Sequence, residues 1–247
     1  MQNAHAPFFR DLPESKNAIL LIHGILGTPR FFDFLMDLIP PDWTVHNILL
    51  DGHGHDVQAF SHTSMENWMR QVVQEITLLS HQHKRVFICG HSMGTLLALK
   101  AAHMFPDCVQ AMLLLAVPLR ISLNMRSSLR SIAVALNLAA PAEQASRDMI
   151  RAYSITPDRR IWRYLGWIPR YLELFRLIRD VRRLIPSLHV KCTALQSGRD
   201  EMVSLRAVDD LKRCPQLKLL TLPHSGHYAY APGDEAVVRA ELARLLP

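Results

Sequence analysis

Short runs of apolar residues alternate along the chain with longer stretches that are rich in helix-forming residues. The runs at 18–22 and 85–89 are typical of buried strands, and the stretch at 95–102 is typical of a helix. The pattern predicts strands at 18–22, 44–50, 85–89, 109–116, 189–196 and 217–222, and helices at 29–38, 64–80, 92–105, 204–213 and 234–246. Because strands and helices alternate, we expect an α/β fold with a mostly parallel sheet and helices on both faces.

The segment at 118–188 differs in character from the sequence on either side. It contains thirteen arginines, no lysine and five acidic residues, and therefore carries a net charge of +8. The whole chain carries +6, so the remainder is slightly acidic at −2. Apolar residues recur in the segment at helical spacing, as at Trp162, Leu165, Ile168 and Leu172. We interpret 118–188 as a helical cap inserted into a core domain of residues 1–117 and 189–247, lining a pocket from above.

The arginines of this segment admit two interpretations. They can form a solvated helical face that keeps the cap soluble, or some of them can attract an anionic substrate or an acidic membrane surface. The second interpretation implies peripheral contact between the cap and a membrane. Nucleic acid is not expected as a partner, because hydrophobic stripes interrupt the basic segment and no recognisable nucleic-acid-binding module is present.

The composition is that of one folded domain. With 247 residues, about half of them hydrophobic, the chain is long enough for a single large α/β domain. No apolar run approaches the ~18 residues of a transmembrane helix, and the first residues lack the basic and apolar regions of a signal peptide. The four cysteines are well separated and two lie in predicted strands, where reduced thiols are expected. These features predict a cytoplasmic protein and do not indicate an oligomeric state.

The segment at 90–94 reads Gly-His-Ser-Met-Gly and fits the Gly-x-Ser-x-Gly pattern of a nucleophile elbow. In such an elbow, a tight turn between a strand and a helix presents the serine oxygen to a base and to an oxyanion site. Glycine suits both flanking positions because other backbone passes close to them. The predicted strand before the motif and the predicted helix after it supply this context, so Ser92 is the candidate nucleophile.

A second turn follows the strand at 18–22, where residues 23–27 read His-Gly-Ile-Leu-Gly. Acyl transfer needs two amide N–H groups directed at the developing oxyanion. We expect one from Met93, the residue after the nucleophile, and the other from Ile25 in this early loop. His23 is assigned a structural role, because the base of such sites follows the acid in the chain.

Candidates for the acid and the base follow the last two predicted strands. Asp200 and Glu201 are adjacent, and because neighbouring side chains diverge, only one of them can point inward. His224 and His227 share the next loop. His227 follows a glycine that lets the loop fold inward, whereas His224 lies closer to the strand. Geometry decides between such candidates.

Four motifs occur in the order that is typical of the α/β-hydrolase superfamily: His23-Gly24, Gly90-x-Ser92-x-Gly94, Gly198-x-Asp200-x-x-Val203 and Ser225-Gly226-His227. More narrowly, the chain resembles compact bacterial carboxylesterases and monoacylglycerol-lipase-like hydrolases, whose Gly-His-Gly loop is matched at 52–54. The resemblance covers residues 17–117 and 189–247. It implies an α/β-hydrolase fold with Asp200 as the acid and His227 as the base.

One position departs from the pattern of that family. Many members carry Phe where this chain has Ile25. The oxyanion donor is a backbone amide, so the substitution leaves the donor in place but can reshape the acyl pocket.

The resemblance also implies a reaction. It is that of a serine hydrolase that cleaves carboxylic esters, either short- to medium-chain acyl esters or monoacylglycerols, through an acyl-enzyme intermediate. The partner is then a small-molecule acyl ester, and no cofactor is expected. Thioesterases and lactonases use the same machinery and stay open as alternatives, as does a catalytically idle binding module. Dehalogenases and epoxide hydrolases resemble this fold but use an aspartate nucleophile, which Ser92 argues against.

The cluster Asp-Gly-His-Gly-His-Asp at 51–56 raises the alternative of a metal site. Two histidines at i and i+2 with nearby carboxylates can ligate zinc. Such a site needs further ligands from elsewhere in the chain, and the esterase resemblance already accounts for the Gly-His-Gly part. We therefore expect no metal.

Overall fold

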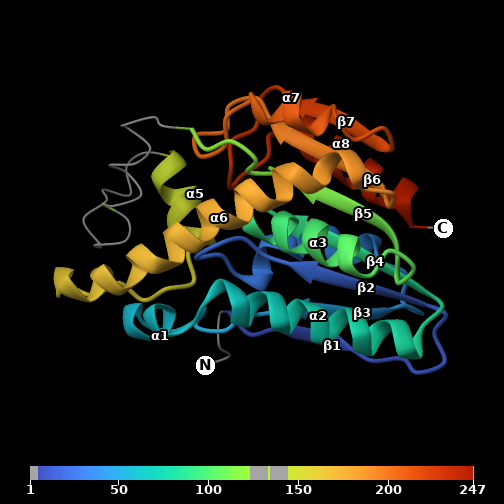
Figure 1. The fold of residues 1–247 in the computed structure, drawn as a ribbon, viewed down its shortest axis with the longest axis horizontal. Helices are drawn as coiled ribbons and strands as arrows, with labels where there is room; N and C mark the ends of the chain where they lie inside the picture. The colour runs from blue at the N-terminus through green and yellow to red at the C-terminus, as the bar shows by residue number, and fades with distance from the viewer. Residues whose placement is uncertain (1–4, 123–132, 134–143, 247) are drawn as a thin grey trace.

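A mixed sheet forms the centre of the molecule (Figure 1). The computed structural model describes residues 5–122, 133 and 144–246. Within them the sheet has seven strands in the order β1-β3-β2-β4-β5-β6-β7, all parallel except β1, which pairs antiparallel with β3. The strands are β1 (Phe8–Arg10), β2 (Asn17–Ile22), β3 (Thr44–Ile48), β4 (Arg85–His91), β5 (Val109–Leu115), β6 (Lys191–Ser197) and β7 (Leu217–Leu222). The predicted α/β fold with a mostly parallel sheet is confirmed.

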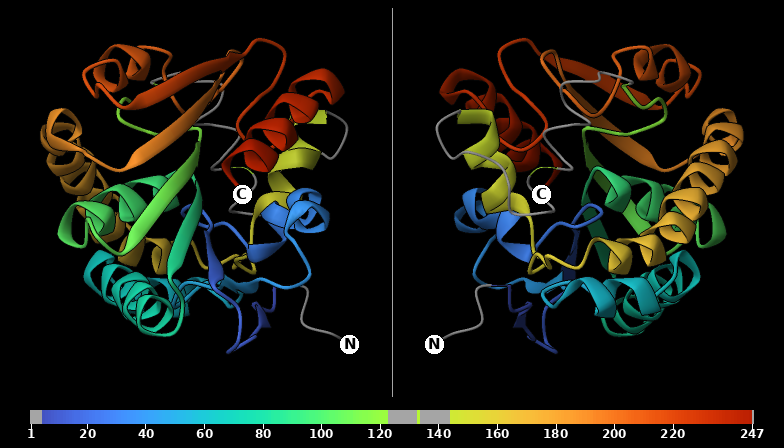
Figure 2. Two further views of the ribbon diagram at one scale, coloured as in Figure 1. Left: turned by 90° about the vertical axis from the view of Figure 1, so that its right-hand side faces the viewer. Right: turned by 90° about the vertical axis from the view of Figure 1, so that its left-hand side faces the viewer.

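Helices cover both faces of the sheet, as the end-on views in Figure 2 show. One face packs against α2, α3 and α6, with Trp68 and Val181 in its core. The other packs against η1 and α8 through residues such as Phe32 and Val238. The covering helices are η1 (Pro29–Leu38), α2 (Met65–Gln82), α3 (Met93–Met104), α6 (Ile168–Leu184) and α8 (Pro232–Leu245). No helix in the described part of the chain is long and apolar enough to cross a membrane.

Local structure departs from the predictions at a few places. The pattern does not predict β1, which has only three residues, or the short helix α1 (Val57–His62). The Asp56 side chain starts α1 by accepting two backbone N–H groups of the first turn, a cap that a hydrophobic pattern does not reveal. The helix at 29–38 is a 3-10 helix, and α7 (Ala207–Leu211) is shorter than the helix expected at 204–213.

The described part of segment 118–188 contains four helices. They are α5 (Gln144–Ala152), η2 (Ile161–Trp167), α6 and η3 (Ile185–Ser187). One side of α6 packs against α2 and α3 and so covers a face of the sheet, while η2 and the start of α6 project beyond the carboxyl ends of the strands (Figure 1). Residues 123–132 and 134–143 of the expected cap lie outside the described residues. The division into core and cap remains a proposal.

Candidate active site

Ser92 lies in a sharp turn between β4 and α3, at the carboxyl edge of the sheet. Its φ of 51° and ψ of −124° are unfavourable for a residue with a side chain, and its N–H donates to Leu115 O at 2.9 Å. Close packing requires glycine at position 94, two residues after Ser92. A Cβ at Gly94 would lie 2.0 Å from the carbonyl oxygen of Ile22. The turn therefore has the geometry that the 90–94 motif predicts.

His227 reaches the serine from the loop between β7 and α8. Its Nε2 lies 3.1 Å from Ser92 Oγ, and its Nδ1 lies 2.8 Å from Asp200 Oδ2. With Nδ1–H donating to the carboxylate, Nε2 is free to accept the seryl proton. The structure thus brings the three predicted residues into one hydrogen-bonded chain, and the side chains of His227 and Asp200 are both almost fully buried.

Asp200 and Glu201 have separate hydrogen-bonding roles. Asp200 follows β6, and its Oδ1 accepts the backbone N–H groups of Met202 at 2.8 Å and Val203 at 2.7 Å. Its second oxygen is left for His227. The Glu201 carboxylate accepts the backbone N–H of His227 at 3.1 Å, so it contacts the loop and not the imidazole. The side chains of Asp200 and Glu201 therefore point in different directions, as the sequence predicts for adjacent residues.

The loop that carries His227 is fixed at its start as well. The buried Asp234 carboxylate, in the first turn of α8, accepts the backbone N–H of His224 at 2.8 Å and the hydroxyl of Ser225 at 2.7 Å. The His224 side chain is exposed. It therefore lies away from the buried Ser92 side, where His227 lies.

The electrostatics of His227 follow from its partners. Burial lowers the pKa of its imidazole, but the charge and hydrogen bond of Asp200, with the charge of Glu201, outweigh burial and raise the pKa above 6.5. The site thus stabilises the imidazolium that forms when His227 takes a proton. The His91 ring lies next to the His227 ring, with centroids 4.9 Å apart and planes tilted by 47°. Burial, together with the nearby charge of His227, holds the pKa of His91 well below 6.5, so His91 stays neutral.

Ile25 and Met93, the predicted oxyanion donors, both border the pocket that contains Ser92. Met93 is the first residue of α3, where backbone N–H groups lack partners within the helix. The loop that carries Ile25 is held in place at the next residue, Leu26. Leu26 has a φ of 57°, and its N–H donates to His53 Nε2 at 3.1 Å.

Two buried, neutral histidines hold this early loop in place. His23 donates from Nδ1 to Gly24 O at 2.8 Å and accepts the Leu50 N–H at Nε2. His53 donates from Nδ1 to Asp51 O while its Nε2 serves Leu26. Burial, first of all, lowers the pKa of His23 well below 6.5 and that of His53 to about 4. Since both ring nitrogens of His53 are already used, it fits a structural role in the 51–56 cluster better than zinc ligation.

A pocket with a cavity volume of about 100 Å³ opens above Ser92. Its walls are mainly apolar. Described lining residues include Ile25, Leu26, Phe31, Pro118, Ile121, Tyr153, Tyr171, Leu174, Phe175, Met202, Val203 and Tyr228. No Asp or Glu is among the described residues of this lining. The pocket suits an uncharged, apolar group with few polar atoms.

Sequence reasoning missed two groups that support the histidine. The Nε2 of His91 donates to the backbone carbonyl of His227 at 3.1 Å, and its other side stacks on Phe31 with ring centroids 3.7 Å apart. His91 lies inside the elbow motif, but the pattern leaves that position open. Phe31 carries no signal in the sequence, since only the fold brings η1 next to β4.

The four apolar residues that mark the helical spacing of segment 118–188 do not border the pocket. Trp162, Leu165, Ile168 and Leu172 are all more than half exposed and are not part of the described pocket lining. Tyr171, Leu174 and Phe175 line the pocket from α6 instead. The helical spacing was a correct signal for a helix, but it did not tell which face meets the pocket.

The fold is that of an α/β hydrolase, and comparisons with known proteins agree. A family model described as serine aminopeptidase, S33 (Hydrolase_4) matches residues 13–227. The chain belongs to that family.

Relatives and solved structures add the following likenesses. A carboxylesterase of Bacillus subtilis is 23% identical over 198 residues, which span 78% of this chain and 75% of the relative. The structure of the metagenome-derived lipolytic enzymes LipS and LipT superposes with a TM-score of 0.74 at 22% identity, covering 98% of this chain and 97% of the other. The monoacylglycerol lipase of Paleococcus ferrophilus gives 0.68 at 17% identity, covering 97% and 96%. At these identities the structures support the fold alone.

Proposed function

We propose that the protein is a carboxylic ester hydrolase that acts on short- to medium-chain acyl esters or monoacylglycerols through Ser92, His227 and Asp200. The observation that carries the proposal is the unbroken hydrogen-bonded chain from Ser92 Oγ to Asp200 Oδ2 through the imidazole. It lies at the floor of an apolar pocket that fits an acyl chain. Membership in a serine hydrolase family supports the same chemistry.

The reaction follows from these positions. Ser92 Oγ attacks the ester carbonyl carbon while its proton passes to His227 Nε2. The carbonyl oxygen becomes an oxyanion, which the N–H groups of Met93 and Ile25 bind. As the C–O bond breaks, the proton on Nε2 passes to the departing alcohol and an acyl-enzyme remains. A water molecule repeats both steps, which releases the acid and restores Ser92.

The lining of the pocket favours an ester over the N-terminus of a peptide. Binding an N-terminal ammonium group in a buried site calls for a carboxylate partner. The described lining has no Asp or Glu, and the two carboxylates beside His227, those of Asp200 and Glu201, already accept hydrogen bonds. We therefore place acyl esters ahead of aminoacyl amides, with thioesters and lactones as substrates of the same machinery.

Two measurements test the proposal. A fluorophosphonate probe should label the wild-type protein and not Ser92→Ala, because only an activated serine reacts; an unlabelled wild type would favour a binding module. A series of p-nitrophenyl esters, monoacylglycerols, acyl thioesters and aminoacyl p-nitroanilides should then show highest kcat/KM with esters. Preference for the anilides would replace the proposal with the peptidase reaction.

A further inference from the structure

Large exposed apolar side chains gather on one short part of the surface. Of thirteen such side chains among the described residues, six lie between 161 and 175. They are Ile161, Trp162, Leu165, Ile168, Leu172 and Phe175, and each is more than half exposed. We call these six residues the outer stripe. An apolar cluster of this kind on a protein surface marks a site of interaction.

The outer stripe is continuous because the spacing of its residues matches the local helix. In the 3-10 helix η2 residues three apart lie above one another, which aligns Trp162 with Leu165 and leads on to Ile168. From there α6 continues with the spacing of four and three that joins Leu172 and Phe175. The opposite side of α6 is buried, so the helix has one apolar face inside and a second one outside.

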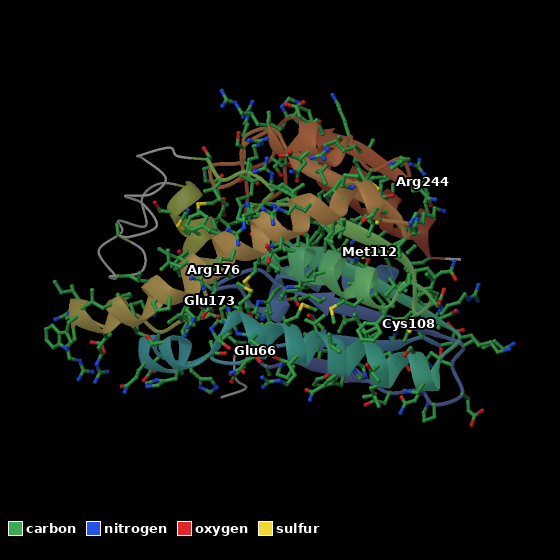
Figure 3. All side chains as sticks on the ribbon, viewed as in Figure 1. Glu66, Cys108, Met112, Glu173, Arg176 and Arg244 are labelled. Atoms are coloured by element: carbon green, nitrogen blue, oxygen red, sulfur yellow. The ribbon has the colours of Figure 1, made fainter. Side chains whose placement is uncertain are left out.

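The stripe rests on a fixed base. Trp167 Nε1 donates to Val57 O at 3.1 Å, and the Arg170 guanidinium donates to Ser61 O at 2.9 Å. Glu173 pairs with Arg170 and accepts the backbone N–H of Met65. Figure 3 shows Glu173 and Arg176 on the part of α6 that lies beside the start of α2, where Glu66 is labelled. The exposed face is therefore held in place and is not a loosely attached helix end.

Basic charge surrounds the stripe. Residues 158–183 contain eight arginines and three acidic residues, a net charge of +5. Some arginines are paired, such as Arg160 and Arg163 with Asp158. Arg176 follows the last stripe residue directly and Arg179 lies one turn further along α6, both exposed. A helix with an apolar face bordered by arginines is suited to the interface of a membrane that carries anionic lipids.

We propose that the outer stripe and the arginines beside it dock the protein on the surface of an anionic phospholipid bilayer. A second copy of this chain would bring the same charge of +5 against itself, so charge complementarity favours the bilayer. The surface is also continuous with the catalytic pocket, because Phe175 belongs to the stripe and lines the pocket beside Tyr171 and Leu174. Docking does not require catalysis. Delivery of a lipid ester from the bilayer to Ser92 rests on the proposed function.

Vesicle sedimentation tests the docking directly. The full-length wild type should bind phosphatidylcholine vesicles that contain phosphatidylglycerol at least about tenfold more tightly than pure phosphatidylcholine, and high salt should remove the difference. The double variant Leu165→Ser/Leu172→Ser should weaken binding by about tenfold or more. Its matched control, Leu78→Ser/Met104→Ser, removes two apolar side chains of α2 and α3 that are also exposed, at 45% and 51%, and should bind as the wild type does.

A second pair of variants tests the charge. Arg176→Gln/Arg179→Gln should lower binding to the anionic vesicles, while Arg206→Gln/Arg213→Gln, which changes the same charge on exposed residues beside α7, should not. Equal losses in a variant and its control, or no binding by the wild type, would overturn the proposal. Thermal melting of every variant verifies that it is folded.

Two further outcomes are separated by design. If analytical ultracentrifugation without lipid finds a wild-type dimer that Leu165→Ser/Leu172→Ser converts to monomer, the stripe is an interface between copies and the docking proposal is wrong. Vesicle binding by Ser92→Ala should equal that of the wild type. A wild type that binds vesicles but hydrolyses no ester would contradict the proposed function and leave docking in place.

Discussion

The carboxyl edge of the sheet and the outer stripe differ in whether their side chains have partners within the protein. At the edge, Ser92, His227 and Asp200 are buried and each makes hydrogen bonds that fix its orientation. On the stripe, large apolar side chains are left facing outward on a helix whose other face is fully packed. Preorganised polar groups thus indicate chemistry, whereas apolar side chains that are held in place without a packing partner indicate a surface to be covered.

The largest expected effect tests whether the edge works through Asp200. Asp200→Asn should lower kcat for a soluble p-nitrophenyl ester by about 10⁴, because the amide cannot both hold the Nδ1–H tautomer and stabilise the imidazolium. Glu201→Gln is the matched control. Its amide oxygen can still accept the His227 N–H, so the loss should stay below about tenfold. Near wild-type turnover in Asp200→Asn would move the acid role to Glu201.

The next effect tests whether the elbow is fixed by close packing. Gly94→Ala places a Cβ of α3 2.0 Å from Ile22 O at the end of β2, and should lower the free energy of unfolding by more than about 4 kcal/mol. Gly233→Ala is the control, because a Cβ there meets nothing within 4 Å. It should change stability by no more than about 1 kcal/mol. Urea denaturation measures both, and similar values for the two variants would contradict the packing argument.

A smaller effect compares the two faces of α6. Leu177 is 3% exposed in the core and Leu172 is 52% exposed on the stripe. Leu177→Ala should cost about 2–5 kcal/mol of unfolding free energy, because it leaves a cavity. Leu172→Ala should stay within about 0.5 kcal/mol. If urea denaturation gives Leu172→Ala a cost as large as that of Leu177→Ala, the stripe is covered in solution.

The sequence predicted the edge of the sheet better than the stripe, for physical reasons. Strands buried on both faces are continuous apolar runs, so the bounds of the inner parallel strands differ from the predicted ones by at most two residues at either end. The edge strand β7 has the predicted bounds although it is only partly buried. The elbow demands glycine at a fixed spacing around Ser92, and such local demands leave a readable motif. The choice of Asp200 over Glu201 and of His227 over His224 rested on the family resemblance, because only the fold determines which of two nearby side chains points toward Ser92.

What the sequence did not predict depends on contacts between distant segments. Phe31 reaches His91 only because η1 packs beside β4, and nothing near Phe31 in the chain indicates that. The same limit applies to the stripe. Helical spacing identified Leu165 and Leu172 as one face of a helix, but both faces of α6 are apolar, and only packing against α3 decides which one is buried.

The smallest effect separates the two regions by pH. Catalysis needs neutral His227, whose pKa is raised above 6.5, because the effect of Asp200 and Glu201 outweighs that of burial and neighbouring His91 stays neutral. Activity should therefore be full above the raised pKa and fall as pH drops through it, approaching tenfold per pH unit below. Removing the negative charge in Asp200→Asn should move the midpoint of its residual activity to lower pH. An unshifted midpoint would assign the titration to another group.

Docking should behave differently over the same range. Arginine keeps its charge at every pH at which the protein is folded, and phosphatidylglycerol stays anionic between pH 5 and 8. Vesicle binding should therefore change little while hydrolysis of a soluble ester declines toward acid pH. Binding that falls in parallel with activity would mean that the two regions are coupled and that the stripe is not a surface independent of the catalytic edge.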